Sequence, residues 1–213
     1  GAAFPEFMRS THVVEPFEVP VGWQRMRSGD YGYASPSCIL WGCIDFDGNI
    51  FIYRELYSSG YTGDVLARII LEMERNDPEM FLSVLDTSCW NKTGLGPSIA
   101  ETMIRNGVRW IPADRDRVSG KVEVHRRLAM NPLTVEPRLK IFSTCTNLIR
   151  TLASIPSSKI NPEDVDTKAD DHAYDALRYM IMTRQSNQPT LNTALNRIKN
   201  KVQYEPSDSV FGY

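Results

Sequence analysis

The sequence predicts a single α/β domain in which a mixed β-sheet is covered by helices on both faces. Three strand-like segments near the start are separated only by short turns, so they should pair as an antiparallel meander. Each later strand is reached through a segment with helical spacing, which favours parallel pairing by a crossover connection. A chain of 213 residues, of which 42% are hydrophobic, is long and apolar enough to build one such core.

The meander consists of the segments 23–30, 37–45 and 49–57. Asp47-Gly48 lies between the second and third segments, and this dipeptide is typical of the tight turn of a β-hairpin. A helix over 62–75 should follow, because apolar residues recur there at helical spacing.

Strands and helices alternate in the next part of the chain. The apolar run 81–86 is typical of a buried strand, and Pro97 and Gly107 mark the start and the end of a helix over 97–106. The remaining expected elements are a strand at 108–111, a basic helix at 119–130, a strand at 138–142, and helices at 144–154 and 169–184.

Two segments of different character flank the expected domain, 23–184. Residues 1–22 are irregular, with apolar residues spaced among prolines, and we expect an ordered lead-in that lies against the core and links it to something upstream. Residues 185–213 form a polar C-terminal tail to which the pattern assigns no structure.

The composition argues against several classes of protein. The formal net charge of −2 does not suit a uniformly basic nucleic-acid coat, but it leaves room for a local basic cleft. No run of about 18 apolar residues is present and no secretory signal begins the chain, so we expect neither a membrane partner nor secretion. Four cysteines without a CxxC pair and three histidines argue against a zinc site or a disulfide framework.

Two aspartates lie where strands are expected to end. Asp30 ends the first strand between Gly29 and Gly32, whose lack of side chains would let a ligand approach the carboxylate; a simple turn is the alternative. Asp86 ends the buried strand, and residues at such ends line the crevices of α/β sheets. The alternative for Asp86 is an N-terminal cap for the following turn.

Two further aspartates lie in the last expected helix. Asp171 and Asp175 are four residues apart, so they share one helix face with Cβ atoms about 5–6 Å apart. Two like charges at this spacing disfavour the helix unless a cation lies between them. Capping of the helix start explains Asp170 or Asp171 well, but it explains Asp175, one turn further on, poorly.

These carboxylates come from three distant segments and could converge at one edge of the sheet. Oxygen ligands with few histidines select hard cations such as Mg²⁺ or Mn²⁺. Two such ions about 3.5–4 Å apart can hydrolyse a phosphodiester without a nucleophilic side chain. This chemistry fits a sequence that has no convincing Ser/His/Asp or Cys/His arrangement.

Six motifs follow one another along most of residues 1–184. They are the lead-in GAAFPEFMRSTHVVEPFEVPVGW, the triplet Asp30-Tyr31-Gly32, YRELY, LDTS, GPSIAETMIRNG and DDHAYDALRY. In this order they resemble the C-terminal nuclease domain of the large terminase subunit of tailed bacteriophages. The closing motif, DDHAYDALRY, is the most specific of the six.

The resemblance implies a ribonuclease H-like fold and metal-dependent cleavage of double-stranded DNA during genome packaging, with two Mg²⁺ or Mn²⁺ ions as cofactors. It implies that Asp30 and Asp86 are catalytic metal ligands. We expect Asp171 to be the principal third ligand, with Asp175 beside it. His172 and Glu55 are candidates to assist, although a cross-strand ion pair explains Glu55 as well.

The resemblance also implies partners. In the full protein these would be an N-terminal ATPase domain, the portal and the small terminase subunit, acting in the host cytoplasm where virions assemble. The phosphate-binding motif GxxxxGK[ST] does not occur in these residues. We therefore expect the ATPase domain to lie outside this chain and residues 1–22 to be the linker from it.

The segment 105–127 carries seven Lys or Arg residues against three acidic ones. We expect it to contact DNA phosphates, although a solvated helix face explains the charges equally well. The candidate DNA-binding residues are Arg105, Arg109, Arg115, Arg117, Lys121, Arg126 and Arg127.

Two alternative functions remain open from the sequence. Another ribonuclease H-like nuclease, such as a Holliday-junction resolvase or a transposase, would use the same carboxylates. A non-catalytic module that docks on the packaging motor would bind metal without cleaving DNA.

Overall fold

The computed structural model describes residues 1–186. The helical elements in this part of the chain are α1 (Arg9–His12), α2 (Gly63–Met73), η1 (Thr87–Trp90), α3 (Ile99–Arg105), α4 (Arg117–Leu128), α5 (Thr146–Ser154) and α6 (His172–Ser186). The strands are β1 (Val13–Val14), β2 (Gln24–Asp30), β3 (Ser37–Ile44), β4 (Ile50–Ser58), β5 (Met80–Leu85), β6 (Ile111–Pro112), β7 (Met130–Asn131), β8 (Glu136–Pro137) and β9 (Leu139–Phe142).

Seven of these strands form one mixed sheet in the order β1-β9-β4-β3-β2-β5-β6. β2, β3 and β4 are antiparallel neighbours, because the turns between them are too short for a crossover. β5 pairs in parallel with β2 and β9 with β4, and the outer strands β6 and β1 extend the two edges in parallel. The predicted meander with added parallel strands is confirmed.

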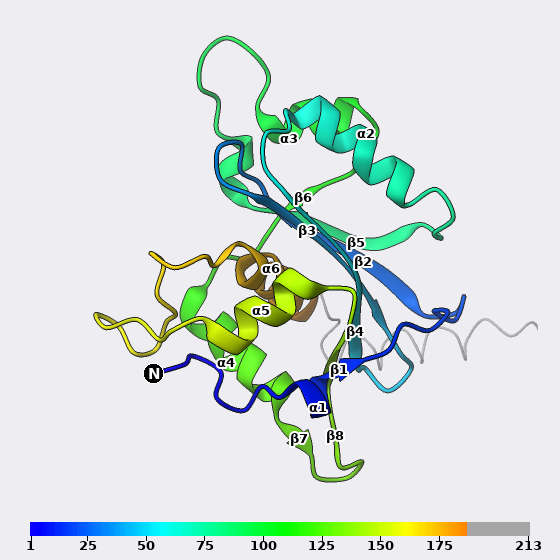
Figure 1. Ribbon diagram of the computed structural model, residues 1–213. Helices are drawn as coiled ribbons and strands as arrows, with labels where there is room; N and C mark the ends of the chain where they lie inside the picture. Colours follow the sequence, from blue (N-terminus) through cyan, green and yellow to red (C-terminus); the bar gives the residue numbers. More distant parts are fainter. Residues whose placement is uncertain (187–213) are drawn as a thin grey trace, which may run out of the picture.

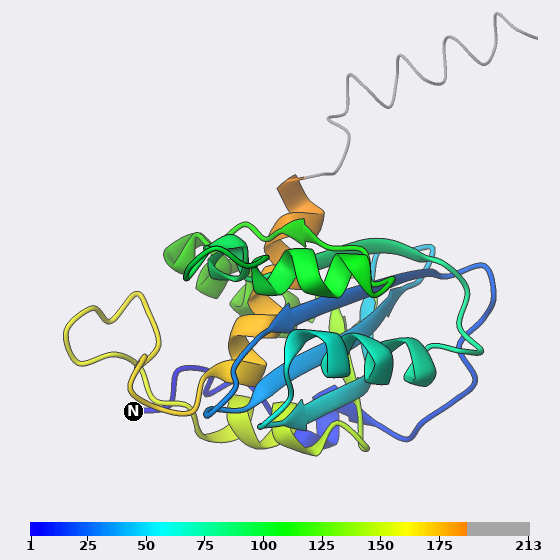
Figure 2. The same ribbon diagram turned by 90° about the horizontal axis from the view of Figure 1, so that it is seen from above.

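Helices cover both faces of this sheet, as predicted (Figure 1). α2 and α3 pack together on one face, and Figure 2 shows them lying over the strands. α4, α5 and α6 lie on the other face, where α6 contacts the strands and the other two helices pack against it. The small hairpin of β7 and β8 extends away from the sheet near α1.

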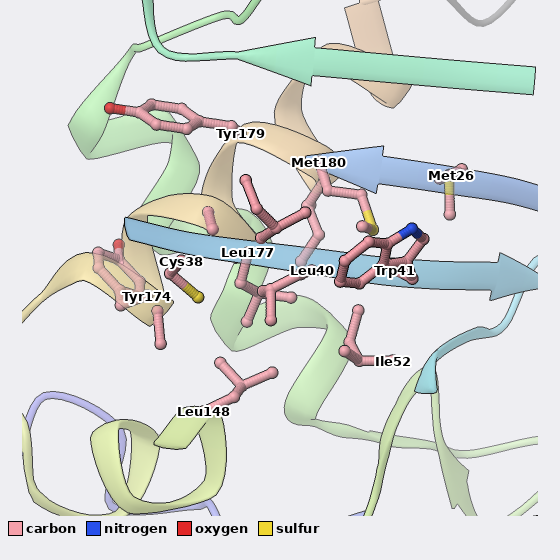
Figure 3. Packing of buried hydrophobic residues seen from close by; sticks show 14 of the residues in the cluster. Met26, Cys38, Leu40, Trp41, Ile52, Leu148, Tyr174, Leu177, Tyr179 and Met180 are labelled. Atoms are coloured by element: carbon pink, nitrogen blue, oxygen red, sulfur yellow. The ribbon is translucent and has the colours of Figure 1, made fainter. Parts of the chain in front are cut away.

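α6 forms the centre of the second helical layer. Its side chains are buried throughout 173–183, as expected for a helix enclosed between a sheet and two further helices. Figure 3 shows Leu177 and Met180 in this layer together with Leu40 of β3. Gly42 permits the close approach of helix and strand, because a Cβ there would lie 2.7 Å from the Met180 sulfur.

The strand predicted over 108–111 is wrong in its extent, because only Ile111–Pro112 pairs with β5. Side chains take the hydrogen bonds that a longer ladder would have used. The carbonyl of Arg109 accepts from Arg27 at 2.9 Å and also from the hydroxyl of Ser83. Tertiary contacts of this kind leave no local signal in the sequence.

The helices α2 to α6 begin one to three residues away from their predicted starts, and two of these differences bear on the site. α4 begins at Arg117 because the carboxylate of Asp116 accepts from the backbone N–H of Ser119 at 2.9 Å and caps the helix. α6 begins at His172, and the carbonyl of Asp171 accepts its first helical hydrogen bond at 2.8 Å. Asp171 therefore precedes the helix rather than lying within it.

The first residues of the chain lie against the domain. Ala3, Phe4 and Phe7 are buried in the core, and β1 adds a strand beside β9. Whether residues 1–22 act as a linker stays a prediction. Most of the expected tail, 187–213, lies outside the described residues. Within residues 1–186, no helix is both long enough and apolar enough to cross a membrane.

Candidate active site

The carboxyl ends of β2 and β5 place Asp30 and Asp86 at one edge of the sheet. Asp30 is the last residue of β2, and Asp86 directly follows β5. The two strands are parallel with Gly29 opposite Leu85, and the backbone N–H of Asp86 donates to the Gly29 carbonyl at 3.1 Å. Adjacent parallel strands therefore bring the two aspartates together, at the kind of edge where α/β sheets bind ligands.

The start of α6 brings Asp171 and Asp175 to the same edge. The hydroxyl of Ser28 in β2 donates to the carbonyl of Ala176 at 2.6 Å, which ties the N-terminal part of α6 to the strand that ends in Asp30. The charges of Asp171 and Asp175 act on one another, and the charge of Asp30 acts on each of them. Residues more than 140 positions apart along the chain thus share one acidic site.

Burial and mutual repulsion change the proton affinity of these carboxylates. Burial raises the pKa of Asp30, against a hydrogen bond with His172 that lowers it. The charges of Asp175 and Asp86 raise the pKa of Asp30 further. Burial also raises the pKa of Asp171 to about 7, with a further contribution from the charge of Asp175. Such a cluster is stabilised by any cation that enters it.

His172 supplies one positive group beside this cluster. Its Nδ1 lies 2.9 Å from Oδ2 of Asp30, and this hydrogen bond raises the pKa of His172. The ring is partly exposed, whereas the Asp30 side chain is 12% exposed. The protonated imidazole therefore offsets part of the charge that burial makes unfavourable on Asp30.

Two arginines supply the other positive groups. Arg178 of α6 donates to Asp175 at 3.0 Å. Arg117, the first residue of α4, lies 3.3 Å from Asp175 and 3.7 Å from Asp171. Gly120 lets α4 lie this close to α6, because a Cβ there would lie 2.6 Å from the side chain of Arg178. Asp175 is thus paired with two arginines and Asp171 with one.

The donor set suits a hard divalent cation, although the carboxylates are paired with protein groups. The four aspartates offer only oxygen ligands, which Mg²⁺ and Mn²⁺ prefer. Within residues 1–186, no group of three or more His, Cys, Asp or Glu side chains is already arranged to hold a metal ion. His172 and Arg117 take up the carboxylate oxygens that would serve as ligands. The charge and chemistry of the site fit the cation, and Arg117 must give up its contacts with Asp171 and Asp175 before a cation can occupy them fully.

Comparison with known proteins points to one fold. No protein-family model matches the sequence, and no curated protein does. The nuclease domain of the P22 large terminase matches with a TM-score of 0.70 at 18% identity, over 87% of this chain and 93% of that one. The large terminase of the thermophilic bacteriophage D6E matches with a TM-score of 0.71 at 18% identity, over 85% of this chain. This chain spans 45% of the length of the D6E protein.

A third match is the large terminase nuclease of the thermophilic phage G20c. Its cobalt-bound structure matches with a TM-score of 0.54 at 13% identity, over 84% of this chain and 96% of that one. This chain has the fold of a large terminase nuclease domain. The ribonuclease H-like architecture predicted from the sequence is confirmed by these matches.

Two candidate carboxylates of this terminase nuclease fold also make structural hydrogen bonds. Asp86 accepts from the backbone N–H of Ser88 at 3.2 Å and from its hydroxyl at 2.6 Å, so it caps η1 while lying at the acidic edge. Glu55 accepts from the backbone N–H groups of Asn147 at 2.7 Å and Leu148 at 2.9 Å, so it caps α5. Glu55 therefore points to a helix start, and within residues 1–186 its carboxylate is held by hydrogen bonds at α5 rather than by an ion pair across the strands.

The basic segment 105–127 does not form one surface in the terminase nuclease fold. Arg117 lies in the acidic site, and Lys121 and Arg127 are buried, with exposed fractions of 7% and 6%. Lys121 donates to the carbonyl of Pro162 at 2.9 Å, and Arg127 donates to backbone carbonyls. The candidates that remain exposed are Arg105, Arg109, Arg115 and Arg126.

Three residues at the site were not among the sequence candidates. Asp164 accepts from Nε of Arg117 at 2.7 Å. Arg178 pairs with Asp175, and their spacing of three residues within a helix was a readable signal for that contact. Tyr179 is buried, which raises its pKa, and nearby carboxylate charges raise that pKa further. Asp164 lies in an irregular segment whose sequence gives no signal for its position.

Proposed function

We propose that this chain is the nuclease domain of a viral large terminase subunit and cuts double-stranded concatemeric DNA by metal-dependent hydrolysis. The observation that carries the proposal is the meeting of Asp30, Asp86, Asp171 and Asp175 at one sheet edge of this fold. Structures of the G20c large terminase nuclease with bound cobalt and with bound zinc support a divalent cation in the same fold.

Each side chain has a proposed task in the reaction. Two Mg²⁺ or Mn²⁺ ions, when bound, supply activation of the attacking water and stabilisation of the leaving oxygen. Asp30, Asp86 and Asp171 would hold the ions, and Asp175 would lie beside them as a further oxygen donor. His172 orients the Asp30 carboxylate through its Nδ1, 2.9 Å from Oδ2. Because no side chain acts as the nucleophile, the site needs no Ser or Cys of its own.

The larger protein would supply the other activities. Structures of the D6E large terminase include complexes with ATP-γ-S and with ADP, and this chain spans less than half of that protein. An N-terminal ATPase domain would therefore accompany the chain, and the portal and the small terminase subunit would be further partners in the host cytoplasm. Double-stranded DNA would be the substrate.

Plasmid digestion tests the activity directly. The domain is incubated with supercoiled DNA in Mg²⁺, Mn²⁺, Ca²⁺ or a chelator, and Asp30→Asn serves as the inactive control. We expect nicked and linear products with Mg²⁺ or Mn²⁺ and none with the chelator. Full activity in excess chelator would contradict the proposal.

The same assay separates the two alternative functions. Cleavage of a four-way junction in preference to a linear duplex would favour a resolvase-like nuclease. Binding of Mn²⁺ without cleavage of any DNA would favour a non-catalytic module that docks on the motor.

A further inference from the structure

Arg117 is the one sequence candidate for DNA binding that lies inside the acidic site. It is the first residue of α4, and its side chain is 29% exposed. Three carboxylates surround its guanidinium: Asp164 at 2.7 Å, Asp175 at 3.3 Å and Asp171 at 3.7 Å. A residue so placed is committed to these acids and cannot serve at the same time as an ordinary phosphate contact.

The three contacts differ in what else holds each carboxylate. Asp175 also pairs with Arg178, which is 1% exposed. For Asp171, within residues 1–186, Arg117 is the ion-pair partner. Of Asp171 and Asp175, Asp171 is therefore the one that depends more on Arg117 for a positive partner, and it is also the proposed principal third ligand.

Asp164 gives Arg117 a partner that does not depend on Asp171 or Asp175. The segment that carries Asp164 is fastened to α4 one turn further on, because Nζ of Lys121 donates to the carbonyls of Pro162 at 2.9 Å and Asp164 at 3.4 Å. The shortest contact of Arg117 is with Asp164. The guanidinium can keep this partner when its longer contacts with Asp171 and Asp175 are lost.

We propose that Arg117 is the resident counter-cation of the acidic site, that it competes with a divalent cation for Asp171 and Asp175, and that it withdraws to Asp164 when the cation binds. The inference rests on the proposed function, because it assigns a positioning role toward the metal of that site. A guanidinium and a divalent ion at the same carboxylates repel each other, so both cannot be held there at full strength. Arg117 therefore keeps the metal-free cluster folded and lowers its affinity for metal.

Calorimetric titration with Mn²⁺ in the absence of DNA tests the competition. Arg117→Gln should bind Mn²⁺ at least about tenfold more tightly than wild type, which corresponds to about 1.4 kcal/mol. Arg126→Gln is the matched control, because Arg126 lies on the same helix and pairs with Glu123 rather than with the cluster. The control should stay within about twofold of wild type. Unchanged or weaker Mn²⁺ binding by Arg117→Gln would overturn the inference.

A double-mutant cycle separates the effect of the Arg117–Asp164 contact on Mn²⁺ affinity from the long-range effect of the Asp164 charge. In wild type, Asp164→Asn should weaken Mn²⁺ binding several-fold, because Arg117 then has only the metal ligands as partners. In the Arg117→Gln background, Asp164→Asn should change the affinity by less than about twofold. Equal effects in both backgrounds would show that Asp164 acts only through space and would overturn the withdrawal to Asp164.

A second variant at the same position, Arg117→Lys, checks that the result with Arg117→Gln does not come from misfolding. Arg117→Lys keeps the charge but lacks the planar fork that reaches several carboxylates, so its Mn²⁺ affinity should lie between wild type and Arg117→Gln. Mn²⁺ binding that follows this order without DNA cleavage would support the inference while the nuclease function fails. Cleavage by wild type with no gain in affinity on replacing Arg117 would leave the function standing and overturn the inference.

Discussion

Asp171→Asn should make the metal-free protein more stable at alkaline pH. Folding raises the pKa of Asp171 from 3.8 to about 7, through burial first and the charge of Asp175 second. A folded-state pKa above the unfolded one means that the folded protein holds the proton more tightly, so stability falls as pH rises between these two values. Once both states are ionised, at pH 8, the cost of the charged Asp171 amounts to up to about 4 kcal/mol.

Urea denaturation in a chelator measures this cost. Asparagine keeps the size of the side chain and cannot ionise, so Asp171→Asn should exceed wild type by about 2–4 kcal/mol at pH 8 and by less than about 1 kcal/mol at pH 4. Added Mn²⁺ should stabilise wild type and leave the variant almost unchanged.

The neighbouring Asp170 provides a control, because its pKa is shifted in the opposite direction to that of Asp171. Partial burial acts to raise the pKa of Asp170, but hydrogen bonds from Tyr57 and Arg150 outweigh this effect, so the pKa is lowered overall. Its ionised form therefore stabilises the fold above the unfolded pKa, and Asp170→Asn should be less stable than wild type at pH 8. Reduced stability of both variants at pH 8 would refute the reasoning, because it would show that Asp171 carries no electrostatic cost.

Three further predictions concern residues at and around the site. Asp30→Asn and Asp86→Asn should each reduce plasmid cleavage to below about 1% of wild type in gel time courses, since both would be metal ligands; activity in either would place the site elsewhere. Glu55→Ala should lower the free energy of unfolding by about 1–2 kcal/mol through loss of the α5 cap, and loss of calorimetric Mn²⁺ binding would contradict this structural role. Arg126→Ala should reduce the slope of log affinity for DNA against log salt concentration by up to about 1 in anisotropy titrations, as expected if its side chain contacts one phosphate. An unchanged slope would show that Arg126 is a solvated surface residue that does not contact DNA. Arg127→Ala should chiefly lower the melting temperature, because Arg127 is buried.

The sheet could be predicted because its signals are local. The Asp47-Gly48 turn and the short connections determine the meander, and helical segments between later strands require parallel pairing. The strand over 108–111 could not be placed correctly, because the Arg109 carbonyl is satisfied by Arg27 and Ser83 from other strands.

The candidate site was only partly accessible from the sequence. Asp30 and Asp86 could be placed at one edge because both follow from where strands end, while their roles as ligands stay proposals. The position of Arg117 could not be foreseen, because its partners Asp164 and Asp175 lie 47 and 58 residues away. The basic stretch 105–127 places Arg117 among arginines that are exposed in the structure, such as Arg115 and Arg126.

A crystal structure of the domain soaked in Mn²⁺ tests the central claim most directly. The account predicts anomalous peaks within about 2.0–2.6 Å of carboxylate oxygens of Asp30 and Asp171, with Arg117 turned to Asp164. Saturating Mn²⁺ that binds elsewhere, while Asp30 stays paired with His172 and Asp171 with Arg117, would contradict it.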